Sequence, residues 1–149
     1  MHGVLRSVSI FPNTHNAEHA RVIQESRQNE RYLPGFTLPE NLNVFADLKT
    51  ALDGSQLVLV ATPVVGLRDS IEMLKEYGAG DLPILTACKG FELDTGLLTF
   101  QGVQEVLPDN PKIGVLSGPS FAQELAKQLP CAICLASENF EWIQQLAQE

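Results

Sequence analysis

The stretch "QLVLVATPVVGLRDSIEMLKEYGAGDLPILTACKG" (residues 56–90) decides the fold, because it contains a strand, a helix and a second strand in succession. Residues 56–62 form a continuous apolar, β-branched run, which is typical of a strand covered on both faces. Residues 83–88 form a second apolar run of the same kind. Between the two runs, apolar residues recur at helical spacing: Leu67, Ile71 and Leu74. A strand, a crossover helix and a strand predict two parallel neighbours in one sheet.

The same alternation of strands and helices continues in both directions along the chain. Downstream we expect a helix at 95–107, a strand at 112–117, a helix at 121–129, a buried strand at 131–137 and a last helix at 138–149. Upstream we expect a strand at 7–11, a helix at 17–28, an extended segment at 42–47 and a short helix at 47–54. The sequence therefore predicts an α/β fold with a mainly parallel sheet, in which the strands at 56–62, 83–88 and 112–117 are adjacent.

Composition and charge limit the function classes. The chain has 149 residues, of which 44% are hydrophobic and 19% are charged, as in a soluble globular domain. No apolar run reaches the roughly 20 residues that a membrane-spanning helix needs, and the first residues do not resemble a signal peptide, so we expect a cytoplasmic protein. The net charge of −8 argues against nucleic acid and anionic membranes as partners. An anionic ligand would have to be bound by local groups, because the overall charge of the protein repels it.

The cysteines do not indicate a metal site. Cys131 and Cys134 are three residues apart in an apolar segment, and residues three apart on a strand point to opposite faces. We therefore expect both, together with Cys88, to be small buried hydrophobic residues. His15 and His19 share a helical spacing but lack a third ligand nearby. No metal is expected.

Two strand ends carry the chemistry. In parallel α/β sheets, ligands bind at the carboxyl ends of the strands. Lys89 follows the strand at 83–88, and Gly118, Pro119 and Ser120 follow the strand at 112–117. Gly118 would let a ligand approach the backbone, and Ser120 with Gln123 would form a capping box whose helix N-terminus binds an anion. A phosphate or a polarised carbonyl would suit this site. The alternative is that Gly118, Pro119 and Ser120 only form the turn between a strand and a helix, and that Lys89 is a solvated surface lysine.

The residues around these strand ends resemble one enzyme family. The segments "LTACKGFELDTGLL" (85–98) and "VLSGPSFAQELAKQLPCAICLAS" (115–137) resemble the bacterial NAD(P)-dependent glycerol-3-phosphate dehydrogenases. The segment "NERYLPGFTLPENLNVFADLKTAL" (29–52) fits the N-terminal domain of that family in the same order. The resemblance implies hydride transfer between a nicotinamide, NADPH or NADH, and the pair dihydroxyacetone phosphate and sn-glycerol 3-phosphate. The product supplies phospholipid synthesis.

The resemblance also implies the roles of individual residues. Lys89 falls on the lysine that contacts both the cofactor and the phosphorylated substrate. Gly118 and Ser120 fall on substrate-contact positions. The remaining cofactor-side positions are His15, Asn16, Tyr32 and Ala122. For His15 the alternative is a solvent-exposed residue at the entry of a helix.

Two parts of the family pattern do not match this sequence. A dinucleotide-binding domain opens with G-x-G-x-x-G between a strand and a helix, whereas the G-x-G of this chain, residues 78–80, follows a predicted helix. The resemblance implies that residues 1–149 are an incomplete Rossmann-like domain, without the first strand-loop-helix unit and without the helical C-terminal domain that carries the catalytic lysine. We therefore expect no catalytic residue in this chain, and an inactive fragment. The apolar edges of its strands at 7–11 and 56–62 favour self-association, for which a homodimer is one form.

Two other functions stay open at this point. The chain could be a non-catalytic remnant that binds a phosphorylated metabolite or a partner protein. A different phospho-substrate reductase of the same superfamily fits the segment "LSGPSFA" (116–122) less well.

Overall fold

The computed structural model describes residues 8–12, 17–119 and 121–148. It divides into two compact units. The first unit consists of residues 1–55 and 119–131, and the second unit consists of residues 56–118 and 132–149.

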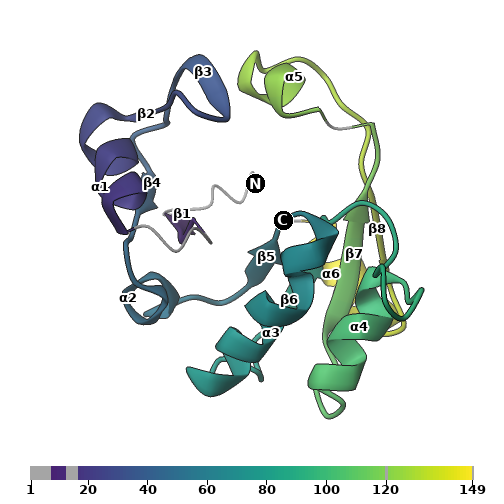
Figure 1. The fold of residues 1–149 in the computed structure, drawn as a ribbon. Coiled ribbons are helices and arrows are strands. Elements are labelled where there is room, and N and C mark those ends of the chain that lie inside the picture. Colours follow the sequence, from purple (N-terminus) through teal and green to yellow (C-terminus); the bar gives the residue numbers. More distant parts are fainter. Residues whose placement is uncertain (1–7, 13–16, 120, 149) are drawn as a thin grey trace. The chain divides into compact units, whose positions relative to one another are not determined.

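The second unit is built on a four-stranded sheet in the order β5-β6-β7-β8 (Figure 1). Its strands are β5 (Val58–Val60), β6 (Ile84–Thr86), β7 (Ile113–Ser117) and β8 (Cys134–Ser137). The first three are parallel, with Ile84 opposite both Val58 and Ile113, and β8 is antiparallel to β7. The prediction that the three apolar runs form adjacent parallel strands is confirmed.

Helices cover both faces of this sheet. The 3-10 turn η1 (Val64–Gly66) leads into α3 (Leu67–Glu76), which packs beside α4 (Thr99–Val106), and α6 (Phe140–Leu146) ends the unit. The hydroxyl groups of Thr86 and Thr99 share a 3.0 Å hydrogen bond, so this face of β6 meets α4. Leu85 points the other way and packs against Trp142 and Ile143 of α6. As the helical spacing predicts, the apolar residues of α3 are buried: Leu67, Ile71 and Leu74.

Two strands of the sheet are less buried than expected. In β5, Val60 is buried, but Leu59 is 52% exposed, so the expectation of two covered faces is wrong for this strand. The expectation of a buried strand at 131–137 is also wrong, because Cys131 and Cys134 are both exposed. Of the three cysteines, Cys88 is buried as predicted. β5 and β8 are the edge strands of the sheet, and an apolar run does not reveal whether its strand is central. Cys131 precedes β8, which begins at Cys134.

Two helices of the second unit begin later than expected. Helix α4 begins at Thr99, because Gly96 has a φ of +68° and Leu98 is extended. Helix α6 begins at Phe140, where the side chain of Asn139 accepts a hydrogen bond from the Trp142 amide at 3.1 Å.

The described residues of the first unit form two small sheets and three helices. Strand β1 (Val8–Ile10) is parallel to β4 (Leu42–Val44), and β2 (Gln28–Asn29) is antiparallel to β3 (Leu33–Thr37). The helices are α1 (Ala17–Ser26), α2 (Leu48–Leu52) and α5 (Ala122–Ala126). The core of this unit is formed by Ala20, Ile23 and Val44, with Leu38 and Leu42 packed against them.

Helix α1 ends two residues before the predicted end. Arg27 takes a φ of 58°, and its guanidinium donates to the carbonyl oxygens of Pro39 and Leu42 at 2.6 and 2.7 Å. The β2–β3 hairpin that follows was not predicted, because Pro34 and Gly35 indicate a turn without showing that short strands flank it.

The strand orders confirm the predicted fold class. In the described part of the chain, β1 is parallel to β4 and β5, β6 and β7 are parallel neighbours, with helices between them in sequence, as expected for an α/β fold with a mainly parallel sheet. Among the described residues, no helix is long and apolar enough to cross a membrane.

Because β6 is more deeply buried than β5, truncating a side chain of β6 should lower the free energy of unfolding more than truncating one of β5. Ile84→Ala, at a fully buried position, should lower the free energy of unfolding by about 2–5 kcal/mol, because it leaves a cavity. The control Leu59→Ala, at the half-exposed position on the neighbouring strand, should cost about 1 kcal/mol or less. Urea titration followed by the fluorescence of Trp142, the only tryptophan, measures both. Equal costs would contradict this description of the sheet.

Candidate functional site

Lys89 and Gly118 meet at the carboxyl edge of the sheet. Lys89 follows β6 and Gly118 follows β7, and because these strands are parallel neighbours, both residues leave the sheet at the same edge. The ammonium group of Lys89 is exposed and donates to the carbonyl oxygen of Gly118 at 3.2 Å. The predicted approach of Lys89 to this turn is therefore present. Ser120, the other half of that prediction, lies outside the described residues.

The backbone at Gly118 admits no other residue without a shift. Its φ is +145°, which L side chains rarely adopt. A Cβ at this position would also lie 2.4 Å from the carbonyl oxygen of Ala132 and 3.1 Å from the Cα of Ile133. The space beside its Cα is thus occupied by the segment that enters β8. Glycine is needed here for two backbone segments to pass, and its expected contact with a ligand stays a prediction.

Cys88 contributes packing at this edge. Its sulfur lies 3.5 Å from the carbonyl oxygen of Val60 and 3.8 Å from the hydroxyl of Thr62, which follows β5. Burial raises the pKa of the Cys88 thiol. A thiol kept protonated in this way is a poor nucleophile.

The loop that carries Lys89 contains a buried acid, Glu92, which the sequence analysis missed. Its carboxylate accepts hydrogen bonds from Arg68 of α3 and from the hydroxyl of Thr95, both at 2.8 Å. The hydrogen bond from Arg68 lowers the pKa of Glu92 and outweighs the opposing effect of burial. No periodic pattern marks Glu92. The sequence offers no signal that separates Glu92 from the other charged residues of the loop "KGFELDTG" (89–96), Lys89 and Asp94, which are exposed in the structure.

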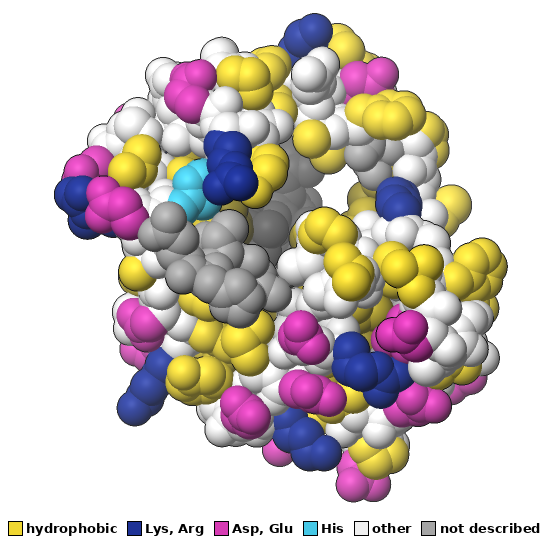
Figure 2. All heavy atoms as spheres, in the orientation of Figure 1, with side chains coloured by type: hydrophobic (Ala, Val, Ile, Leu, Met, Phe, Trp, Pro, Cys, Tyr) yellow, Lys and Arg dark blue, Asp and Glu magenta, His cyan; other side chains and the backbone are white. Residues whose placement is uncertain are grey.

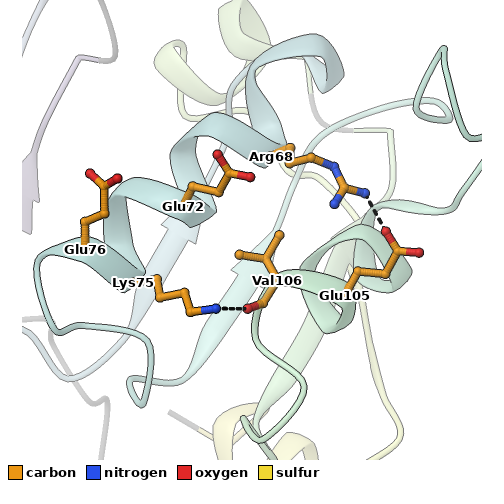
Figure 3. Close-up of a pocket in the computed structure, with 6 residues that line it drawn as sticks. All are labelled: Arg68, Glu72, Lys75, Glu76, Glu105 and Val106. Atoms are coloured by element: carbon orange, nitrogen blue, oxygen red, sulfur yellow. Dashed lines mark hydrogen bonds and ion pairs between the residues drawn. The ribbon is translucent and has the colours of Figure 1, made fainter.

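Charged side chains of α3 and α4 line a surface hollow of about 370 Å³ (Figure 3). The hollow is lined by Arg68, Glu72, Lys75, Glu76, Glu105 and Val106. Arg68 pairs with Glu105 at 2.8 Å, and Lys75 donates to the carbonyl oxygen of Val106 at 3.1 Å. Figure 2 shows acidic and basic side chains mixed over these helices. The hollow has three carboxylates and two cations, of which Arg68 is already ion-paired, so its net charge does not favour an anion and it is a poor phosphate site.

The described cofactor-side residues belong to the first unit. Tyr32 is 61% exposed, with the guanidinium of Arg31 5.1 Å from its ring centroid and His19 in edge contact at 5.9 Å. Ala122 is exposed at the start of α5, which lies against β3. His15 and Asn16 lie outside the described residues. The structure thus brings Lys89 together with Gly118 in the second unit and places the other two in the first.

Helix α5 does not form the predicted anion site. Its N-cap is Phe121, which makes no side-chain capping bond, so the helix begins one residue later than a capping box of Ser120 and Gln123 predicts. The helix has five residues and carries the acidic Glu124 in its first turn. A helix this short has little dipole, and the carboxylate of Glu124 opposes an anion. In the described part of the site, Lys89 is therefore the group that can attract a phosphate.

The other sequence signals have structural roles. Gly78 has a φ of +72° and follows the end of α3, and Ala79 is buried, so this G-x-G is a helix-ending turn as expected. Within the described ranges, no group of three or more His, Cys, Asp or Glu residues is arranged to hold a metal ion.

Comparisons with known proteins find one family. The model of the "NAD-dependent glycerol-3-phosphate dehydrogenase N-terminus" matches residues 5–143. A relative from Neisseria meningitidis serogroup C, a glycerol-3-phosphate dehydrogenase [NAD(P)+], is 68% identical over 136 residues, which cover 91% of this chain and 41% of the relative. A relative of the same name from Dechloromonas aromatica is 42% identical over 127 residues, which cover 85% of this chain and 38% of the relative.

A solved structure agrees with these relatives. The glycerol-3-phosphate dehydrogenase of Coxiella burnetii superposes with a TM-score of 0.83 at 30% identity, over 95% of this chain and 42% of that one. The chain spans about two fifths of the length of the curated relatives it matches, such as 41% of the Neisseria meningitidis protein.

The lowered pKa of Glu92 predicts a pH-dependent contribution to stability. Because folding lowers this pKa below its ordinary value of 4.5, the stabilisation is complete above about pH 4.5 and is lost as the pH falls through the folded pKa. Glu92→Gln should therefore cost about 1–3 kcal/mol at pH 7 and progressively less below pH 4.5. Urea titrations from pH 7 to pH 3, followed by Trp142 fluorescence, measure this difference. A cost that stays constant over this range would contradict the prediction.

Proposed function

Because the chain belongs to the NAD-dependent glycerol-3-phosphate dehydrogenase N-terminal family, we propose that it supplies cofactor- and substrate-binding residues of such an enzyme. The enzyme transfers a hydride between NADPH or NADH and the pair dihydroxyacetone phosphate and sn-glycerol 3-phosphate. It works in the cytoplasm, and its product enters phospholipid synthesis. The observation that carries this proposal is the contact between Lys89 and Gly118 at the carboxyl edge of the sheet.

Lys89 is suited to attract a phosphorylated substrate. Its ammonium group is exposed, and among the described residues no carboxylate lies within ion-pair distance of it. Its hydrogen bond goes to the neutral carbonyl of Gly118, so the positive charge stays uncompensated. In a protein of net charge −8, this is the local device that an anionic ligand requires. The same charge would stabilise negative charge that develops on the substrate carbonyl during reduction.

The other proposed contacts complete the two ligand sites. Ser120 and Gly118 join Lys89 on the substrate side. The cofactor side consists of Lys89, His15, Asn16, Tyr32 and Ala122. Residues 1–149 form, in this proposal, an incomplete dinucleotide-binding domain, because the sequence has no G-x-G-x-x-G loop to bind the pyrophosphate. Dimerisation stays a prediction, and no comparison favours the alternative of a non-catalytic remnant.

A hybrid enzyme tests the proposed role of Lys89. In it, this chain replaces the matching part of the Neisseria meningitidis relative, so that the length of the relative is kept. The hybrid should reduce dihydroxyacetone phosphate with NADPH, and Lys89→Ala should lower kcat/KM by about 100-fold or more, because it removes the charge at the reacting carbonyl. The control is Lys75→Ala, which removes a lysine that also donates to a backbone carbonyl but lies in the hollow between α3 and α4. An active hybrid that tolerates Lys89→Ala would refute the role of Lys89.

The chain of residues 1–149 should be inactive by itself. Without a pyrophosphate loop it should bind NADPH poorly, and no residue in it is proposed to protonate the alkoxide. Fluorescence titration with NADPH and an assay of dihydroxyacetone phosphate reduction measure both properties. Micromolar binding together with turnover would show that these 149 residues contain a complete site.

A further inference from the structure

The loop from Lys89 to Leu98 is held by one buried side chain. Between these two residues Glu92 is buried, whereas the apolar Phe91 and Leu93 are 60% and 85% exposed. The amide of Glu92 donates to the carbonyl of Leu97 at 3.0 Å, and its carbonyl accepts from the amide of Gly96 at 2.9 Å. The buried side chain of this loop is therefore an acid, although two apolar residues flank it.

The carboxylate of Glu92 is fixed by both helices that cover this face of the sheet. Its Oε2 accepts from Arg68 of α3 at 2.8 Å and from Thr95 of the same loop at 2.8 Å. Its Oε1 is buried without a hydrogen-bond partner among the described residues and lies against Gly102 of α4. A Cβ at Gly102 would be 2.6 Å from Oε1. Glycine inside a helix costs about 1 kcal/mol relative to alanine, so α4 gives up stability to admit this carboxylate.

We infer that Glu92 is a positioning residue for Lys89: its buried carboxylate fixes the loop after β6 so that the ammonium group of Lys89 stays at the carboxyl edge of the sheet. Two residues, Gly90 and Phe91, separate the two side chains, and both are exposed. Gly90 also has a φ of +104°, and the backbone of Phe91 is paired only through an isolated antiparallel bridge to Leu98 at the far end of the loop. The direction of Lys89 therefore depends on where Glu92 is fixed. This inference rests on the proposed function of Lys89.

The chain contains a matched control for Glu92. Glu105 accepts from the same nitrogen of Arg68 at the same distance of 2.8 Å, but its side chain is 55% exposed and it belongs to α4 instead of the loop. Removing its charge alters the same guanidinium without releasing the loop. A comparison of Glu92→Gln with Glu105→Gln separates the position of Lys89 from the general effect of losing a partner of Arg68.

The test uses the hybrid enzyme and a double-mutant cycle. Glu92→Gln should lower kcat/KM for dihydroxyacetone phosphate about 10-fold or more, because small misplacements of a positioned group are costly, and Glu105→Gln should leave it within about twofold. In the Lys89→Ala background, Glu92→Gln should change kcat/KM by less than about twofold, because Glu92 acts through Lys89. An equal loss in both backgrounds would overturn the inference, since a purely structural role would be additive.

A second variant and a second measurement cover the other outcomes. If Glu92→Gln does not fold, Gly102→Ala displaces the same carboxylate while favouring the helix, and the same cycle applies to it. Hydrogen exchange of the Gly96 amide should speed up in Glu92→Gln and not in Glu105→Gln, and unchanged exchange in Glu92→Gln would overturn the inference without any assay of activity. An inactive hybrid, or an active hybrid in which Lys89→Ala has no effect, would count against the proposed function. In either case the hydrogen exchange of the Gly96 amide still tests whether Glu92 fixes the loop.

Discussion

The parallel hydrogen bonding of β6 to β5 and β7 is the constraint on which the rest of the second unit depends. β6 is buried at all three positions, with Leu85 facing α6 and Thr86 facing α4, so both layers of helices are placed by this strand. Because its neighbour β7 runs in the same direction, the residues that follow the two strands emerge together. An antiparallel pair would have sent Lys89 and Gly118 to opposite edges. The parallel direction of the two strands therefore brings Lys89 and Gly118 together, and the hydrogen bond between them is secondary.

The charges of the second unit are divided between two arrangements. On α3 and α4, acids and bases pair with one another, as Arg68 does with Glu92 and Glu105. At the sheet edge, Lys89 meets a neutral carbonyl and keeps its charge available. A protein with an overall negative field can attract an anion only where a positive charge has no acidic partner, and Lys89 is such a charge at the carboxyl edge of the sheet.

The sequence was most informative about the central strands and least informative about edges, caps and loops. The runs at 83–88 and 112–117 became the central strands β6 and β7, and the helical pattern between the runs at 56–62 and 83–88 correctly predicted that the edge strand β5 is parallel to β6. Burial was wrongly expected for Cys134, because apolarity does not distinguish an edge strand from a central one, and for Cys131, which precedes that strand. Ser120 and Gln123 have the letters of a capping box, yet the helix begins at Ala122, since a short motif does not fix where hydrogen bonding starts. Glu92 escaped notice because its burial depends on Arg68 and Gly102, which are distant in the sequence.

The turn at Gly118 has a consequence for how this fold can diverge. Its Cα faces the carbonyl of Ala132 with no space for a single methyl group, so two segments of backbone are in direct contact where side chains usually separate them. Where two side chains are in contact, a substitution of one can be compensated by a substitution of the other. A contact between two backbones cannot be compensated in this way. In a related protein with another residue in place of Gly118, the backbone that enters β8 would have to follow a different path. Only glycine therefore fits at this position while the chain keeps its present path into β8.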